Sequence, residues 1–244
     1  MIYEIMKKIT LISLFSALSC SAFIHAGGMG EQSFSNAGFI SLEGGYTMNT
    51  IDNYNFNIVG FNQAFSSIKS TQHYTGILSA GMLFMMDDLF AVTSELGWGY
   101  YGRTTLDPAF VGFGNLTIEH TLTGFDALIG IAYIQPSYSL FLKGGALIQN
   151  MQIKTSVESY DPTFPLANGF TSKINHTAAL PEIKIGASYN FDTNWSLTGA
   201  YIFAMGSTPQ STGFLDETTF TSNLTSNNLN PTINALVLGI QYTC

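Results

Sequence analysis

The sequence predicts an all-β protein: an eight-stranded antiparallel transmembrane β-barrel with long external loops and short periplasmic turns. Three observations lead to this fold class. Segments of about ten residues alternate apolar with small or polar side chains, the period of a strand between two different environments. Only 10% of the residues are charged although 46% are hydrophobic, whereas a soluble domain carries about 25% charged residues. The connections between the segments are alternately short and long, which is typical of barrels that span a membrane.

The first 26 residues predict a secretory signal peptide, which leaves residues 27–244 as the barrel domain. Lys7 and Lys8 form a short positive region, a mostly apolar stretch follows, and Ala26 is the small residue that a signal peptidase requires. Beyond this segment no run of about 20 apolar residues offers a spanning helix. The rest of the chain is therefore either soluble or spans a membrane with strands.

Eight segments carry the strand pattern. In each of them every second side chain is apolar, for example Leu42, Leu78, Leu96, Ile129, Leu142, Ile185, Leu197 and Leu238. The side chains between them are small or polar and face the other way. Aromatic residues collect near the ends of the apolar faces, at the level of the lipid headgroups. The predicted strands are residues 39–48, 74–84, 89–100, 125–133, 138–148, 180–191, 195–203 and 233–242.

The connections between these strands alternate strictly. Three are short turns near Asp87, Pro136 and Thr193. The other four are rich in Asn, Ser, Thr and Gly, have low β-propensity and demand no core. These long loops are residues 49–72, 101–124, 150–179 and 204–232. An even number of strands places both termini on the periplasmic side with the short turns.

Six charged residues fall on the inner face of the predicted barrel. Hydrocarbon requires an apolar outer face, and a lysine there near the midplane would cost about 2–4 kcal/mol. Side chains can fill the interior of an eight-stranded barrel, so we expect these residues to plug the lumen. This lumen polar network, four acids and two bases, consists of Glu43, Glu95, Asp126, Lys143, Glu182 and Lys184.

The soluble alternative is a secreted β-sandwich or a lipocalin-like barrel. Such proteins bury their apolar faces inward and carry many charges outward, which eight Lys and Arg residues cannot supply. The net charge of −8 also argues against nucleic acid as a partner.

Five segments resemble the strand motifs of one known family: GFISLEGGY (38–46), GFDALIGIAY (124–133), LFLKGGA (140–146), PEIKIGASYNF (181–191) and INALVLGIQY (233–242). Through them the chain resembles the OmpA-like small outer-membrane β-barrels over essentially all of residues 27–244. The resemblance implies a bacterial outer membrane as the location. It also implies outer-membrane lipid, lipopolysaccharide and the barrel-assembly machinery as partners. Family members include porin-like, adhesive and structural proteins, so the fold does not give the function.

The chain departs from the family at its C-terminal end. Beyond Tyr242 there is no room for the peptidoglycan-binding domain of larger relatives, so anchoring to the cell wall is not implied. The family usually ends in an aromatic residue that the assembly machinery recognises, but here Thr243 and Cys244 follow Tyr242. Either Tyr242 acts as the signal from two places back, or assembly is less efficient than usual.

Three histidines are the candidates for catalysis. Lipid A-modifying barrels use His with Ser and a carboxylate near the outer rim, because nucleophilic catalysis needs a base beside a hydroxyl. His73, His120 and His176 lie near external strand ends, but none has Ser two residues on. We expect rim histidines in polar loops, and no enzyme. Neither these residues nor Asp87-Asp88 has a metal-ligand pattern, so no metal or cofactor is predicted.

Three hypotheses for the function remain. The first is a structural or surface-interaction (adhesin-like) role, in which the external loops contact host molecules or other surface ligands, since binding commonly resides on loops. The alternative is a narrow porin-like channel, which the charges in the lumen disfavour. A lipid A-modifying enzyme is the third.

Overall fold

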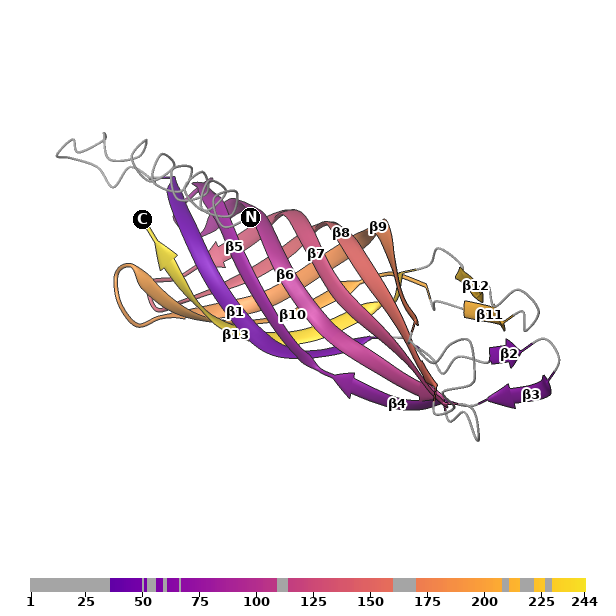
Figure 1. The fold of residues 1–244 in the computed structure, drawn as a ribbon. Helices are drawn as coiled ribbons and strands as arrows, with labels where there is room; N and C mark the ends of the chain where they lie inside the picture. Colours follow the sequence, from indigo (N-terminus) through magenta and orange to yellow (C-terminus); the bar gives the residue numbers. More distant parts are fainter. Residues whose placement is uncertain are drawn as a thin grey trace, which may run out of the picture.

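The computed structural model of the chain is a closed antiparallel β-barrel (Figure 1). It describes residues 36–49, 51, 56–58, 61–65, 67–108, 114–159, 170–207, 211–215, 222–226 and 230–244. The predicted signal peptide, residues 1–26, lies outside the described residues. In the part that is described, no helix has the length and apolar character to cross a membrane.

Eight strands form the barrel wall in the described part of the chain, as the sequence predicts. They are β1 (Ala37–Asn49), β5 (Tyr74–Met85), β6 (Phe90–Pro108), β7 (Gly114–Ile134), β8 (Tyr138–Ser159), β9 (Phe170–Asn190), β10 (Trp195–Ala204) and β13 (Ile233–Thr243). Each pairs with the next, and β13 pairs with β1, so the sheet closes and leaves no free edge. A short strand, β4 (Ser67–Gln72), precedes β5 and pairs with the far part of β6.

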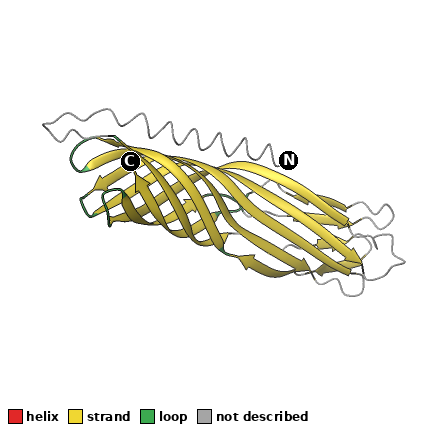
Figure 2. Ribbon diagram, turned by 60° about the vertical axis from the view of Figure 1, so that its left-hand side comes forward, coloured by secondary structure: helices red, strands yellow, loops and turns green. Residues whose placement is uncertain are grey.

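The strands are strongly tilted. Paired residues followed from Glu43 through β5, β6, β7 and β8 lead to Ala178 on β9. Followed the other way, through β13 and β10, they lead to Ser188, ten residues further along the same strand. Closing a sheet with such an offset requires the strands to cross the barrel obliquely, as Figure 2 shows.

Three tight turns and the two ends of the barrel sheet lie together at what we call the turn end. The turns follow β5, β7 and β9, as predicted. In the first, the Asp87 carboxylate accepts hydrogen bonds from the backbone N–H groups of Leu89 (2.9 Å) and Phe90 (2.7 Å). Gly38 and Cys244 exchange two backbone hydrogen bonds of 3.0 and 2.9 Å, so β1 begins where β13 ends.

The opposite end, the loop end, carries two small ribbons. One is β2 (Phe56–Ile58) with β3 (Phe61–Phe65), and the other is β11 (Ser211–Leu215) with β12 (Ser222–Ser226). In Figure 1 both lie away from the end marked C.

Outward-facing side chains form an apolar band around the wall. Along the described strands of this band no outward position carries a charge. Rings near the turn end pair across strands, for example Trp195 with Tyr242 at 5.0 Å and Phe90 with Tyr133 at 5.4 Å between ring centroids. On the loop-end side of the band, Tyr46 and Trp98 are exposed. An apolar band between aromatic girdles is the outer surface that hydrocarbon requires, so the prediction of transmembrane strands is confirmed.

The prediction of loops at residues 101–124 and 150–179 is wrong over most of both segments. β7 begins at Gly114 and β8 ends only at Ser159, so the wall from β6 to β9 continues well beyond the apolar band. The alternation continues there in the opposite sense, because inward side chains become apolar and outward ones polar. A prediction based on an apolar outer face therefore ends each strand at the point where the outward side chains change from apolar to polar.

The outward face of this extension is held by polar cross-strand pairs. The Gln152 side-chain amide donates to Asn175 at 3.3 Å, and Asn150 donates to Thr177 at 3.4 Å. Such pairs contribute to sheet stability and suit water or lipid headgroups rather than hydrocarbon. Asn150 and Asn175, of a residue type that favours turns, are thus accommodated in the strands of the extension.

A bulge at Gly102 lets β6 enter the extension. Tyr101 points inward and Arg103 outward, so the outward parity changes from even to odd numbers between them. Gly102 has φ of +100°, in the region that favours glycine. A Cβ atom there would lie 2.7 Å from the Gln72 carbonyl oxygen, so this position suits glycine on steric grounds as well.

Candidate functional site in the lumen

The six residues predicted for the lumen come from five strands and all point inward. Each has 6% or less of its surface exposed. They are Glu43 on β1, Glu95 on β6, Asp126 on β7, Lys143 on β8, and Glu182 and Lys184 on β9. The alternation of each strand sets this placement, because an inward position in a closed barrel shields a charge from lipid.

Four of the six are joined by ion pairs, which we call the ion network. The Lys184 ammonium lies 2.9 and 2.8 Å from the two Glu43 carboxylate oxygens and 2.8 Å from Oε1 of Glu95. Lys143 donates to Oε2 of the same Glu95. Two acids and two bases from four strands are therefore matched by charge-assisted hydrogen bonds, the strong kind.

Lys143 has a second set of partners that the sequence pattern did not identify. Its ammonium lies 4.6 Å from the centroid of the Phe141 ring and 5.0 Å from that of Phe39. Both distances suit cation–π contacts. The signal available in the sequence was parity alone, since each Phe occupies an inward position among small residues.

The other two acids, Asp126 and Glu182, form no ion pair with the described residues. Tyr101 donates a long hydrogen bond of 3.4 Å to Oδ2 of Asp126. Oδ1 of Asp126 and both carboxylate oxygens of Glu182 have no hydrogen-bond partner among the described residues. Glu182 is only 2% exposed, and a buried polar group without a partner is costly.

Glycine makes room for the carboxyl groups. A Cβ atom on Gly97, which is paired with Asp126 in register, would lie 2.6 Å from Oδ1 of that aspartate. A Cβ atom on Gly239 would lie 2.7 Å from Cγ of Glu43. The small inward residues of the sequence thus provide the space in which the acids sit.

Apolar side chains fill the lumen on the loop-end side of the ion network, and we call this group the outer core. Leu147 lies four residues beyond Lys143 on β8, and Leu180 lies two residues beyond Glu182 on β9. The expected inner face of small residues with a few charges therefore describes the turn-end half only. Members of the outer core include Ile51, Leu106, Ile118, Leu122, Leu147, Met151, Ile153, Leu180, Ile202 and Ile233.

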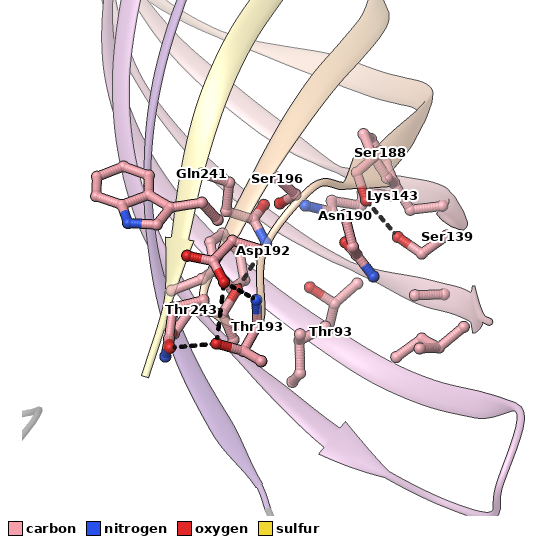
Figure 3. A pocket seen from close by; sticks show the side chains of 17 residues that line it. Thr93, Ser139, Lys143, Ser188, Asn190, Asp192, Thr193, Ser196, Gln241 and Thr243 are labelled. Carbon is pink, nitrogen blue, oxygen red and sulfur yellow. Dashed lines mark hydrogen bonds between the residues drawn. The ribbon is translucent and has the colours of Figure 1, made fainter. Parts of the chain in front are cut away.

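At the turn end the lumen opens into a cavity of about 160 Å³, the vestibule. Its lining includes Lys143 with Phe39 and Phe141, and the turn residues Asp192 and Thr193 (Figure 3). The hydroxyl groups of Ser139 and Ser188 are hydrogen-bonded across its wall at 2.6 Å. The vestibule therefore reaches Lys143 of the ion network from the turn end.

The histidines do not lie in long loops as expected: His120 and His176 are within strands, and His73 is the single residue between two strands. His73 separates β4 from β5, its ring stacks on Tyr46 at 4.6 Å, and its Nδ1 lies 2.9 Å from the Thr47 carbonyl oxygen. His120 is buried on β7, and His176 is on β9. Within the described part of the chain, no three His, Cys, Asp or Glu residues are grouped to hold a metal ion.

Neither a protein-family model nor a curated protein sequence matches the chain. Solved structures similar to it include Ail, the attachment invasion locus protein of Yersinia pestis, with 11% identity, a TM-score of 0.42, and coverage of 86% of this chain and 99% of Ail. The outer membrane protease OmpT from Escherichia coli is 9% identical, with a TM-score of 0.48 and coverage of 89% and 99%. OprG from Pseudomonas aeruginosa is 14% identical, with a TM-score of 0.46 and coverage of 86% and 97%. These similarities concern the fold alone.

Two glutamates of the lumen are expected to respond in opposite directions to the same substitution. Glu43→Met leaves Lys184 with one carboxylate fewer and should destabilise the barrel by about 3 kcal/mol, as breaking buried ion pairs does. Glu182→Met removes a buried carboxyl group without a partner beside the outer core and should stabilise it by about 1–3 kcal/mol. The measurement is the midpoint of thermal unfolding of the refolded barrel, followed by its heat-modifiable mobility in gels. Equal shifts for the two variants would contradict the assignment of partners.

Proposed function

We propose that this chain is a bacterial outer-membrane barrel with a closed lumen, whose structural or surface-interaction (adhesin-like) role is carried by its loop end. The turn end then faces the periplasm and the loop end faces the exterior. The apolar band, the aromatic girdles and the predicted signal peptide support this placement. Lipopolysaccharide and the barrel-assembly machinery are its expected partners.

The observation that carries the proposal is the double filling of the lumen. Lys184 and Glu95 tie together strands from across the barrel, and the ion network has equal numbers of acids and bases. Beyond it lie the buried apolar side chains of the outer core, among which His120 and Gln149 are the inward polar side chains of β7 and β8. A hydrated ion would have to separate charge-assisted hydrogen bonds and then cross this closely filled and mostly apolar layer.

The extension gives the loop end its capacity for interaction. From β6 to β9 the wall stands above the apolar band, with polar side chains outward and the outer core within. It is therefore a stable support for the connections at its tip, and binding residues commonly lie on loops that a rigid scaffold positions.

A narrow porin-like channel is the alternative. The vestibule favours it, since a cavity that opens at the turn end and leads to Lys143 has the position of a channel entrance. We infer no catalytic role: Tyr46 and the Thr47 carbonyl group engage His73, and His120 is buried away from any surface substrate.

The closed lumen predicts that the refolded barrel conducts no ions. Protein inserted into a planar lipid bilayer should give no discrete current steps above the bare membrane. Insertion is checked separately by flotation of the same preparation with liposomes and by heat-modifiable mobility. Regular steps from inserted wild-type protein would contradict the closed lumen and favour the channel.

The surface role predicts that the connections at the loop end are required for attachment. The ends of two connections are close enough for an Asn-Gly turn, because Val157 pairs with Phe170 and the Ser207 N–H donates to the Asn230 carbonyl oxygen at 2.8 Å. Replacing residues 158–169 and 208–229 in this way should abolish the gain in attachment to cultured epithelial cells that the full chain confers. A trimmed barrel that is displayed equally and keeps the whole gain, or a full chain that confers none, would contradict the surface role.

A further inference from the structure

Charges on the outer surface of the strand wall are confined to one side of the barrel. In the described strands β1, β10 and β13, no outward position is charged. On the extension, four charged residues lie at about the same level on four consecutive strands and form what we call the basic row. The basic row consists of Arg103 on β6, Glu119 on β7, Lys154 on β8 and Lys173 on β9.

The basic row carries an excess of two positive charges. Glu119 is the only acid in it, and its carboxylate pairs with Arg103 and lies 3.8 Å from the Lys154 ammonium. Lys173 is exposed and has no ion pair among the described residues. Asp107 lies further along β6, four residues beyond Arg103. Glu158 likewise lies four residues beyond Lys154 on β8, so the positive excess is local to the row.

Two lysines of the row face each other directly. Lys154 and Lys173 are register partners on β8 and β9, so their Cβ atoms lie about 5 Å apart. Like charges directly opposite each other destabilise a sheet, and an anion bound between the two ammonium groups would offset this repulsion. A phosphate group presents several oxygen atoms and accepts hydrogen bonds from more than one ammonium or guanidinium group.

The height and direction of the row indicate where that phosphate comes from. Lys154 lies six residues beyond Ile148, and Glu119 six residues beyond Phe125, both members of the apolar band. Six tilted residues rise about 15 Å, which places the row above the hydrocarbon. The side chains point sideways from the wall, toward neighbouring molecules of the leaflet rather than toward the tip.

We propose that the basic row binds phosphate groups in the sugar region of the lipopolysaccharide that surrounds the barrel. The ligand lies against β6 to β9, whereas the uncharged wall of β10, β13 and β1 has no such site. The inference takes the orientation in the membrane from the proposed function, but it does not depend on whether the lumen conducts. A large soluble polyanion would reach the tip more readily than this lateral surface.

The test is binding of purified lipopolysaccharide to refolded barrel by titration calorimetry. The double variant K154Q/K173Q should bind at least about tenfold more weakly than the wild type, since each basic residue near an anionic lipid surface contributes appreciably. Glu119→Gln removes the acid from the row and should bind more tightly than the wild type. The matched control Q152S/N175S alters the same two strands without changing charge and should bind as the wild type does.

The second arm identifies the anion. The wild type and K154Q/K173Q should bind lipopolysaccharide without phosphate groups with equal affinity. A difference that persists with this ligand, or equal binding of the intact ligand by both proteins, would overturn the proposal. Tighter binding of soluble heparin than of lipopolysaccharide by the row would also overturn it, in favour of an external polyanion. Heat-modifiable mobility shows that K154Q/K173Q is folded, and a conductance measurement tests its closed lumen independently. A failure of lipopolysaccharide binding is therefore distinguishable from a failure of the proposed closed lumen.

Discussion

In hydrocarbon each backbone N–H and C=O group needs a partner inside the protein, and the pairing of β1 with β13 meets this need for the whole sheet. Closure by way of a ten-residue offset tilts the strands and assigns every side chain to lipid or lumen. The outward positions must then be apolar, and the charges of the chain can lie only in the lumen, in the turns or beyond the bilayer. The ion network and the outer core therefore lie in the lumen, and the basic row lies on the wall beyond the hydrocarbon.

The sequence predicts those parts of the fold in which lipid imposes the pattern. Leu236 and Leu238 on β13, or Ile129 and Ile131 on β7, identify strands because hydrocarbon tolerates little else outward. The same pattern does not identify the extension, because Ile118 and Met151 point inward there while Thr121 and Gln152 point outward. A pattern with the opposite polarity resembles loop composition when only the outer face is examined. The bulge at Gly102, which shifts the parity of β6, has no signal beyond a single glycine.

The residues of the lumen were predictable as a set, but their pairing was not. Parity places Glu43 and Glu182 alike on the inner face, and only the geometry of the closed barrel brings Lys184 to Glu43 and leaves Glu182 without a partner. The residues of the basic row are likewise distant in sequence and meet only through register. Pair contacts between strands depend on the offset at which the sheet closes, which no single strand encodes.

The wall crosses from lipid to an aqueous environment where its outward side chains change from apolar to polar. Spin labels placed singly along the outward face of β8, in a Cys244→Ser background, test this crossing in reconstituted bilayers. Labels at Leu142 and Ile148 should be relaxed mainly by oxygen, and labels at Gln152 and Lys154 mainly by a water-soluble nickel chelate. Oxygen relaxation that continues unchanged to Lys154 would contradict the account, because the extension would then lie inside the bilayer.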